Sequence, residues 1–316
     1  MTATAFAPGS VGNVGPGFDV LGLAIETLGD RVTVELTDGP ARVDSVTGRD
    51  ADLVPREPKR NAAAVAATAF LRALGDSRNP VVSIDKGLPL SGGLGGSAAS
   101  SVGGAYAAAL ALNLDPRPLE IAAAALEGET AVAGVHLDNI AASVLGGLTL
   151  VRSVRPIDIV ALTVKANWML AVVTPNVRVE TKAARKLLPA SSGRAMWVQQ
   201  MANSAGVVHA FAAGDGALLR RSLDDLYAEP RRASLIPHFN EAKQAAIAAG
   251  AFGCVMSGSG PTLVAICEDE AIATAAVAAM IEAFRIGDPA YPDRQDCLSH
   301  TLATVSPIAR QGVRPA

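Results

Sequence analysis

Charged and aromatic residues are both scarce in this sequence. Asp, Glu, Lys and Arg make up only 18% of the 316 residues, and Phe, Trp and Tyr only 4%. No Lys/Arg-rich run occurs and the net charge is −3, so the composition argues against a nucleic-acid partner. Half of the residues are hydrophobic, which distinguishes the chain from a disordered one. The length allows one large or two ordinary globular domains.

Cysteine is also rare, and long apolar runs are missing. Cys254, Cys267 and Cys297 lack the spacing of a metal site, so we expect small core residues in a reducing compartment. The N-terminus has no basic flank followed by an apolar run, so no signal peptide is expected. Apolar runs such as residues 271–281 fall short of the ~20 residues that span a bilayer. The sequence predicts a cytoplasmic protein with no membrane partner.

The central glycine-rich stretch, PLSGGLGGSAA from Pro89 to Ala99, lacks the lysine that a P-loop carries after its last glycine. Gly93, Gly95 and Ala98 do fit the dinucleotide-binding pattern G-x-G-x-x-A. That fold expects a second strand ending in an acidic residue about 20 residues further on. The chain has Asp115-Pro116 there, which is typical of a helix start. The dinucleotide interpretation is therefore disfavoured.

The same stretch is nevertheless suited to binding an anion. It follows a strand expected at residues 81–84 and opens an alanine-rich helix expected at residues 98–112. A glycine-rich turn that leads into a helix leaves backbone N–H groups free beside the positive end of the helix dipole. Because no charged side chain occurs between Lys86 and Asp115, the attraction for a phosphate must come from backbone amides, with Lys86 at the entrance. A plain glycine-rich turn is the alternative.

Two shorter stretches also carry polar groups. The loop from Pro8 to Asp19 presents two strongly polar side chains, Asn13 and Asp19. In the alternative interpretation these two side chains only cap their own backbone in a turn. The stretch His136 to Asn139 follows a predicted helix and precedes an apolar segment, which indicates the edge of a site. Its polar set is too small to indicate zinc.

The helix expected from about residue 115 to residue 133 carries Glu129 on the same stripe as the apolar Ile121 and Ala125. An inward carboxylate is costly unless it is paired or bound to a metal. If this helix packs against the one opened by Ser97, Glu129 and the Ser97 hydroxyl would share a Mg²⁺ that also holds nucleotide phosphates. The alternative is a glutamate on the helix surface.

A domain boundary is expected within residues 151–165. Beyond it, the strand and helix patterns predict an α+β layer with an antiparallel sheet. A helix at residues 179–188 places Thr181 and Arg185 on one face. The sequence SGSGPT at residues 257–262 is a loop between two expected strands.

Taken together, these stretches resemble the GHMP small-molecule kinases, and among them the homoserine kinase family most closely. Residues 89–99 are similar to the nucleotide loop P-x-x-x-G-L-G-S-S-A-A, with Gly96 in place of the first serine. The sequence APGSVGNVGPGFDVLGL from residue 7 resembles the family's N-terminal signature, and SGSGPT resembles its C-terminal loop. The family's order of motifs is also matched by His136 to Asn139, by Thr181 with Arg185, and by Glu229-Pro230 with Arg232. The resemblance therefore runs from about residue 2 to residue 305.

The resemblance implies an α+β protein of two domains, with ATP and L-homoserine in the cleft between them. Residues 1–160 would be a GHMP kinase N-terminal ATP-binding domain, like domain 2 of ribosomal protein S5, and residues 161–316 a ferredoxin-like C-terminal domain. Mg²⁺ would be bound by Ser97 and Glu129. The nucleotide would be held by Lys86, Pro89, Leu90, Ser91, Gly92, Gly93, Leu94, Gly95, Gly96, Ser97, Ala98 and Ala99. Homoserine would be bound by Asn13, Asp19, His136, Asn139, Arg185, Arg232, Gly258 and Gly260, and the catalytic group would comprise Ser97, Glu129, Asp138, Asn139, Thr181 and Arg185.

The absence of a lysine from the N-terminal loop bears on both the mechanism and the identity of the acceptor. Sugar and mevalonate kinases of this superfamily use an Asp base beside a Lys in the N-terminal loop, and residues 8–19 contain no Lys. We therefore favour direct in-line phosphoryl transfer, and leave open whether Asp138, Asp19 or no residue takes the hydroxyl proton. The alternatives are another kinase of this superfamily, acting on mevalonate, a sugar or shikimate, and a non-catalytic nucleotide or amino-acid sensor. The sequence does not determine the oligomeric state, a homodimer included.

Overall fold

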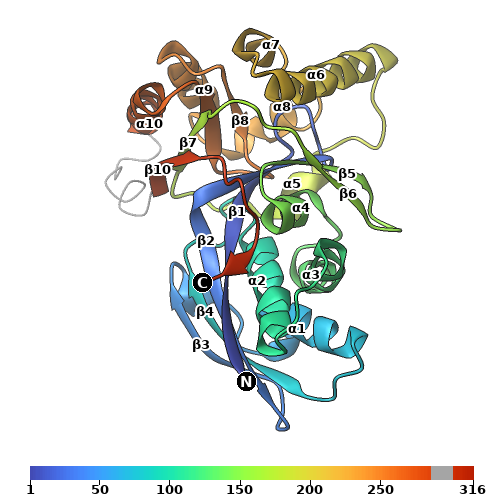
Figure 1. Cartoon of the computed structure of the whole chain (residues 1–316). Coiled ribbons are helices and arrows are strands. Elements are labelled where there is room, and N and C mark those ends of the chain that lie inside the picture. Colours follow the sequence, from blue (N-terminus) through green and yellow to red (C-terminus); the bar gives the residue numbers. More distant parts are fainter. Residues whose placement is uncertain (286–301) are drawn as a thin grey trace.

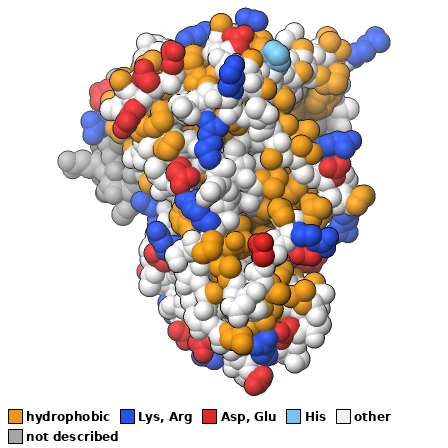
Figure 2. Space-filling model, viewed as in Figure 1, with side chains coloured by type: hydrophobic (Ala, Val, Ile, Leu, Met, Phe, Trp, Pro, Cys, Tyr) orange, Lys and Arg blue, Asp and Glu red, His pale blue; other side chains and the backbone are white. Residues whose placement is uncertain are grey.

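The computed structural model describes residues 1–285 and 302–316 of the chain (Figure 1). Their strands form two sheets, each covered by helices, which confirms the α+β class. The two halves share a core, because Trp168 packs edge-on against Phe211 in the same apolar cluster that contains the first sheet. On the face drawn in Figure 2, charged side chains of both signs are interspersed. No helix in residues 1–285 or 302–316 has the length and apolar character needed to cross a bilayer.

The first sheet is organised around the long strand β2. Its order is β11-β1-β2-β4-β3, and β5 pairs with the other end of β2 and carries β6. All pairs are antiparallel except β3 with β4, which is parallel. The strands are β1 Thr2–Gly12, β2 Leu21–Thr37, β3 Arg42–Gly48, β4 Asn79–Lys86, β5 Leu148–Ser153, β6 Asp158–Leu162 and β11 Arg314–Pro315.

The helices of the first half pack around α2, Gly96–Ala111, which lies against β1 and β2. Small side chains allow this close packing: a Cβ on Gly104 would lie 2.3 Å from the Ala63 carbonyl oxygen in the neighbouring helix, so only glycine fits. The loop that leads into α2 lies against β1, because the Ser10 backbone N–H donates to the Leu94 carbonyl at 3.1 Å. The surrounding helices are α1 Ala62–Ala73, α3 Pro118–Val132 and α4 Asp138–Leu145.

The second sheet has the order β10-β7-β9-β8 and is antiparallel throughout. Its strands are β7 Met169–Thr174, β8 Gly253–Met256, β9 Leu263–Cys267 and β10 Leu302–Pro307. The helices α9 and α10 pack against these strands, and the apolar residues between them form a second core. The helices of this half are α5 Thr181–Lys186, α6 Arg194–Ala213, α7 Gly216–Arg220, α8 Glu229–Arg232, α9 Phe239–Ala248 and α10 Glu270–Arg285.

Asn61 caps α1, with its side chain accepting a hydrogen bond from the backbone N–H of Ala64. Two local predictions are confirmed. The antiparallel arrangement of the second sheet is as expected. Cys254 and Cys267 are buried free thiols, whereas Cys297 lies outside the described residues.

Other predictions are wrong. The segment Pro8 to Gly12 is not loop but the end of β1, paired with β2. The helix α3 is capped at Arg117, whose backbone N–H bonds to Glu120, rather than at Asp115. The tail after Pro307, to which no motif assigned a role, returns to the first sheet, where Phe6 is paired with Arg314.

Candidate active site

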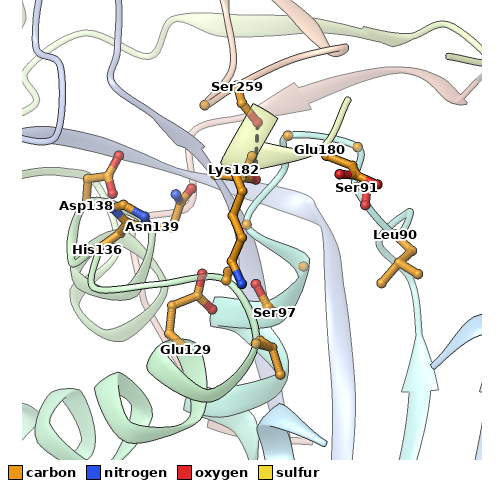
Figure 3. A pocket seen from close by; sticks show the side chains of 18 of the residues that line it. Leu90, Ser91, Ser97, Glu129, His136, Asp138, Asn139, Glu180, Lys182 and Ser259 are labelled. Atoms are coloured by element: carbon orange, nitrogen blue, oxygen red, sulfur yellow. Dashed lines mark hydrogen bonds between the residues drawn. The ribbon is translucent and has the colours of Figure 1, made fainter. Parts of the chain in front are cut away.

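A cavity of about 360 Å³ opens between the two halves of the molecule. The glycine-rich loop and the C-terminal end of α3 form one wall, and the start of α5 with the loop after β8 forms another (Figure 3). It is lined by Asn13, Asp19, Lys86, Pro89, Leu90, Ser91, Gly92, Gly93, Gly95, Gly96, Ser97, Glu129, Val132, Ala133, His136, Asp138, Asn139, Glu180, Thr181, Lys182, Arg185, Arg232, Gly258 and Ser259.

The glycine-rich loop turns sharply into α2 at Gly95, whose φ of 66° is in the left-handed region. A Cβ here would lie 2.4 Å from the Ser10 Oγ, so the position excludes every other residue. The Ala99 N–H donates to the Gly95 carbonyl and is the first such bond of the helix. The amides of Gly96 and Ser97 come before it and have no carbonyl partner within the helix, which is the arrangement that suits an anion.

The second half holds this loop in place from the other side. Ser257 Oγ donates to the Gly93 carbonyl at 2.6 Å, and Thr262 Oγ1 donates to the Gly92 carbonyl. These two hydroxyls provide hydrogen-bond donors for the carbonyl oxygens of Gly92 and Gly93. Its conformation therefore depends on contacts from both domains.

The sequence suggested that Lys86 stands at the entrance of the phosphate site. Lys86 does line the cavity, but it does not stand at the entrance. Its side chain is only 4% exposed and forms a salt bridge with Asp30, on β2. The Nζ also donates to the Gly96 carbonyl at 3.1 Å and to Ser100 Oγ at 3.0 Å. Asp30 carries no motif and lies 56 residues away, so only the pairing of β2 with β4 reveals this partner.

Glu129 is buried and turned toward the cavity, which confirms its inward orientation. Burial is the main cause that raises the pKa of its carboxyl to about 7; a hydrogen bond from Ser97 opposes this shift, and the charge of Asp138 adds to it. Its Oε2 is buried and has no partner among the described residues. An unpaired carboxylate oxygen beside a hydroxyl fits Mg²⁺, which takes one or two carboxylates together with substrate phosphates. No cluster of three or more His, Cys, Asp or Glu side chains suited to a metal occurs in residues 1–285 and 302–316.

Asp138 and Asn139 begin α4 and are fixed from the N-terminal loop and from β1. Asp138 Oδ2 accepts the Asn13 backbone N–H at 3.1 Å, and Asn139 Oδ1 accepts from Ser10 Oγ at 2.9 Å. Burial raises the pKa of the Asp138 carboxyl to about 6, and the charge of Asp19 adds to this shift. Asn13 does not cap only its own turn, because its Nδ2 donates to the Gly258 carbonyl at 2.7 Å.

The far end of the cavity contains a cluster of opposite charges. Arg185 NH2 donates to both oxygens of Asp19, at 2.8 and 3.0 Å, and lies 3.0 Å from His136 Nδ1. Since a guanidinium only donates, Nδ1 accepts and the ring is neutral. This agrees with the pKa of His136, which burial and the charge of Arg185 lower. Arg232 is buried and donates to the Gly258 carbonyl at 3.1 Å.

Phe18 lies near both arginines of this cluster, a contact that the sequence did not predict. Its ring centroid lies 5.4 Å from the guanidinium carbon of Arg185 and 5.4 Å from that of Arg232. Both distances are in the range of cation–π attraction, which offsets part of the repulsion between the two cations. The available signal was an aromatic residue directly before Asp19 in the N-terminal motif.

Most of the predicted site residues are brought together in this cavity, but four are not. Leu94, Ala98 and Ala99 are fully buried in the core and Gly260 packs against Ile236, so none of them lines the cavity. The structure adds five lining residues that the sequence did not indicate: Val132, Ala133, Glu180, Lys182 and Ser259. Thr181, a predicted residue, lies 3.3 Å from Ser259 between hydroxyl oxygens.

Comparison with known proteins gives the same family from sequence and from structure. The model of the GHMP kinases N terminal domain matches residues 61–147, and that of the GHMP kinases C terminal matches residues 207–286. A homoserine kinase from Chlorobaculum tepidum is 36% identical over 99% of this chain and 98% of its own, and one from Pyrococcus abyssi is 40% identical over 85% and 89%.

Solved structures agree with this. The crystal structure of homoserine kinase from Cytophaga hutchinsonii superposes with a TM-score of 0.91 at 36% identity, covering 100% of this chain and 97% of its own. The mevalonate kinase of L. major shares the fold, with a TM-score of 0.71 at 16% identity over 96% of this chain and 95% of its own.

Proposed function

The chain belongs to the homoserine kinases of the GHMP kinase family, and from this premise we propose how its cavity transfers the γ-phosphoryl group of ATP to the hydroxyl of L-homoserine. The product is O-phospho-L-homoserine, an intermediate of threonine biosynthesis. One observation carries the proposal. The unpaired amides and the orphan Glu129 oxygen stand at one end of the cavity, and a cluster of opposite charges stands at the other.

The triphosphate binds at the N-terminus of α2. The amides of Gly96 and Ser97 point their N–H groups at the phosphates, and the helix dipole favours the negative charge. Ser97 and Glu129 would hold Mg²⁺. When bound, this ion neutralises charge that develops on the phosphate oxygens. Arrival of the cation would also lower the pKa of Glu129, because it favours the charged carboxylate.

Homoserine binds at the charged end because its zwitterion matches the pair already present there. Asp19 and Arg185 neutralise each other at 2.8 Å in the cavity. An incoming ammonium group pairs with Asp19, and an incoming carboxylate pairs with Arg185 and Arg232, whose guanidiniums suit planar anions. The exchange keeps the net charge of this end constant. Asn13, His136, Asn139 and Gly258 complete the walls of the pocket.

Transfer proceeds in line without a dedicated base: the homoserine oxygen bonds to the γ-phosphorus as the bond to the β,γ-bridging oxygen breaks, ADP leaves, and the hydroxyl proton passes to a phosphate oxygen. Phosphoryl transfer has a loose transition state, so alignment and charge neutralisation supply most of the catalysis. Asp138 is held by the backbone N–H of Asn13 at the base of the cavity, and burial first and the charge of Asp19 second raise its pKa. Thr181, at the start of α5, contributes a hydroxyl from the opposite wall.

An assay of ADP release across acceptors tests the function. With homoserine, mevalonate, a hexose and shikimate offered separately, turnover is expected with homoserine alone. Turnover with mevalonate and none with homoserine would favour another kinase of the superfamily, and ATP binding without turnover would favour a sensor. We place the protein in the cytoplasm, where ATP and free amino acids are available. Light scattering would test whether it is a homodimer.

A further inference from the structure

We propose that Lys182 is a catalytic residue whose ammonium binds the γ-phosphoryl group during transfer, the role that the sequence suggested for Lys86. The inference rests on the proposed function and assigns the cation of its phosphate end. Lys182 is the second residue of α5, in the second half of the chain, and its side chain lines the cavity.

Lys86 cannot take this role without breaking a buried network. An ammonium has three N–H donors, and the Lys86 Nζ has three protein acceptors: Asp30, the Gly96 carbonyl and Ser100. Asp30 is fully buried and neutralises the charge, while its Oδ1 accepts the backbone N–H of Leu88 at 3.2 Å. The pair therefore fixes the base of the loop, and it presents little net charge to a phosphate.

Lys182 is differently placed. Figure 3 shows its side chain extending from α5 across the cavity in the direction of Ser97 and Glu129. Its residue is exposed, and among the described residues its ammonium has no hydrogen bond or ion pair. The direction leads to the helix N-terminus and the orphan carboxylate oxygen, where the proposed function puts the terminal phosphates.

The other cations of the cavity are already engaged. Arg185 is bonded to Asp19, and Arg232 is bonded to the carbonyls of Ala184 and Gly258. Lys182 is thus the lining cation, within the part of the chain that is described, whose head group can bind a phosphate at no cost in existing bonds. In the transition state negative charge spreads over the oxygens of the transferring phosphoryl group, and a free ammonium that donates to these oxygens stabilises it. Lysine is an established phosphate ligand as a point charge.

The competing interpretation is that Lys182 is an ordinary solvated lysine on a short surface helix. The chain offers a matched control, because Lys186 lies one turn further along α5, is also exposed, and does not line the cavity. The variants Lys182→Met and Lys186→Met remove the same charge from the same helix. Lys182→Arg keeps the charge at the cavity.

Steady-state kinetics and nucleotide binding decide between the two. In Lys182→Met we expect kcat to fall about 10²-fold to 10³-fold, the usual loss when one donor to a developing anion is removed, whereas Lys186→Met stays within about twofold. Lys182→Arg should recover activity to within about tenfold of the unmodified enzyme. The dissociation constant of a non-hydrolysable ATP analogue should rise about tenfold, with that of ADP unchanged, because the contact is to the terminal phosphate.

Three results would overturn the inference: Lys182→Met within about threefold of the unmodified kcat, equal losses in both lysine variants, or equal weakening of ADP and the ATP analogue. Melting temperatures of all variants, measured without ligand, are expected to agree, since an exposed side chain without partners contributes little to stability. Failure of the proposed function looks different, because then the unmodified protein would itself release no ADP with homoserine.

Discussion

Replacing Asp138 by Asn removes a charge that the folded protein has to bury. The residue is 3% exposed, and burial is the largest cause that raises its pKa from 3.8 to about 6. The folded protein therefore keeps this proton after the unfolded chain has lost it, and its stability falls as the pH rises from about 4 to about 6. Above about pH 6 the folded protein bears the full free-energy cost of burying the charged Asp138 carboxylate. Below the pKa of the unfolded chain this cost is absent.

The size of the effect follows from the two pKa values. Proton linkage gives a cost of ~1 kcal/mol at about pH 4.5 and ~3 kcal/mol at about pH 7.5. The asparagine side chain of the variant would carry no charge, but one acceptor oxygen becomes an NH₂ group facing the backbone donors of Asn13 and Asn139, which loses ~1 kcal/mol. Asp138→Asn is thus expected to equal the unmodified protein at about pH 4.5 and to be ~2 kcal/mol more stable at about pH 7.5.

Urea unfolding of the ligand-free protein, followed by circular dichroism at these two pH values, measures the difference. Asp44→Asn is the matched control, because this aspartate side chain is 58% exposed and its replacement should change the free energy of unfolding by less than ~0.5 kcal/mol. A difference between Asp138→Asn and the unmodified protein that does not change with pH would refute the reasoning. In the same variant we expect measurable turnover, whereas a loss of about 10⁴-fold with the fold intact would identify Asp138 as the general base.

Four more substitutions probe the cavity and the residues beside it. Gly96→Ser should change the KM for ATP less than tenfold, since its Cβ would meet nothing closer than 3.4 Å and one hydrogen bond is worth ~1 kcal/mol. Gly95→Ala should lower the melting temperature and weaken ATP binding, because the φ of Gly95 is 66° and a Cβ there would lie 2.4 Å from Ser10 Oγ. Glu129→Gln should reduce kcat by about 10²-fold or more at every Mg²⁺ concentration. The same variant, free of ligand at about pH 7.5, should be no less stable to unfolding, because the raised pKa means that the charged Glu129 carboxylate already destabilises the folded protein. Phe18→Leu should raise the KM for homoserine about tenfold and leave that for ATP unchanged, because two cation–π contacts of ~0.5–1 kcal/mol each are lost; an equal rise for both substrates would contradict this.

Local chemistry made much of the site predictable. The inward position of Glu129 follows from its i+4 spacing with the apolar stripe of one helix, and the helix start after Gly95 follows from the glycine run. In each case the determining residues lie within a few positions of one another. The pattern therefore contains the information.

What the sequence did not predict depends on distant partners. Lys86 is tied down by Asp30 because β2 and β4 are neighbours in the sheet, and a strand register is not visible in either segment alone. Likewise, β3 joins as a parallel neighbour of β4, and β11 returns to β1 from the far end of the chain. Such pairings are set by tertiary packing, which short periodic patterns do not encode.

The two lysines show why charge in the sequence is a poor guide to charge in a site. Both lie near the phosphate end of one cavity, but Lys86 sits within a neutral pair and Lys182 stands free of protein partners among the described residues. The first helps to shape the loop, since Asp30 also accepts the amides of Gly87 and Leu88. The second comes from the other half of the chain. If Lys182 binds the phosphate, the loop amides come from the first half of the chain and the cation from the second. Because Ser257 and Thr262 of the second half also bond the loop, a change in the separation of the halves would alter both the loop and the position of the cation.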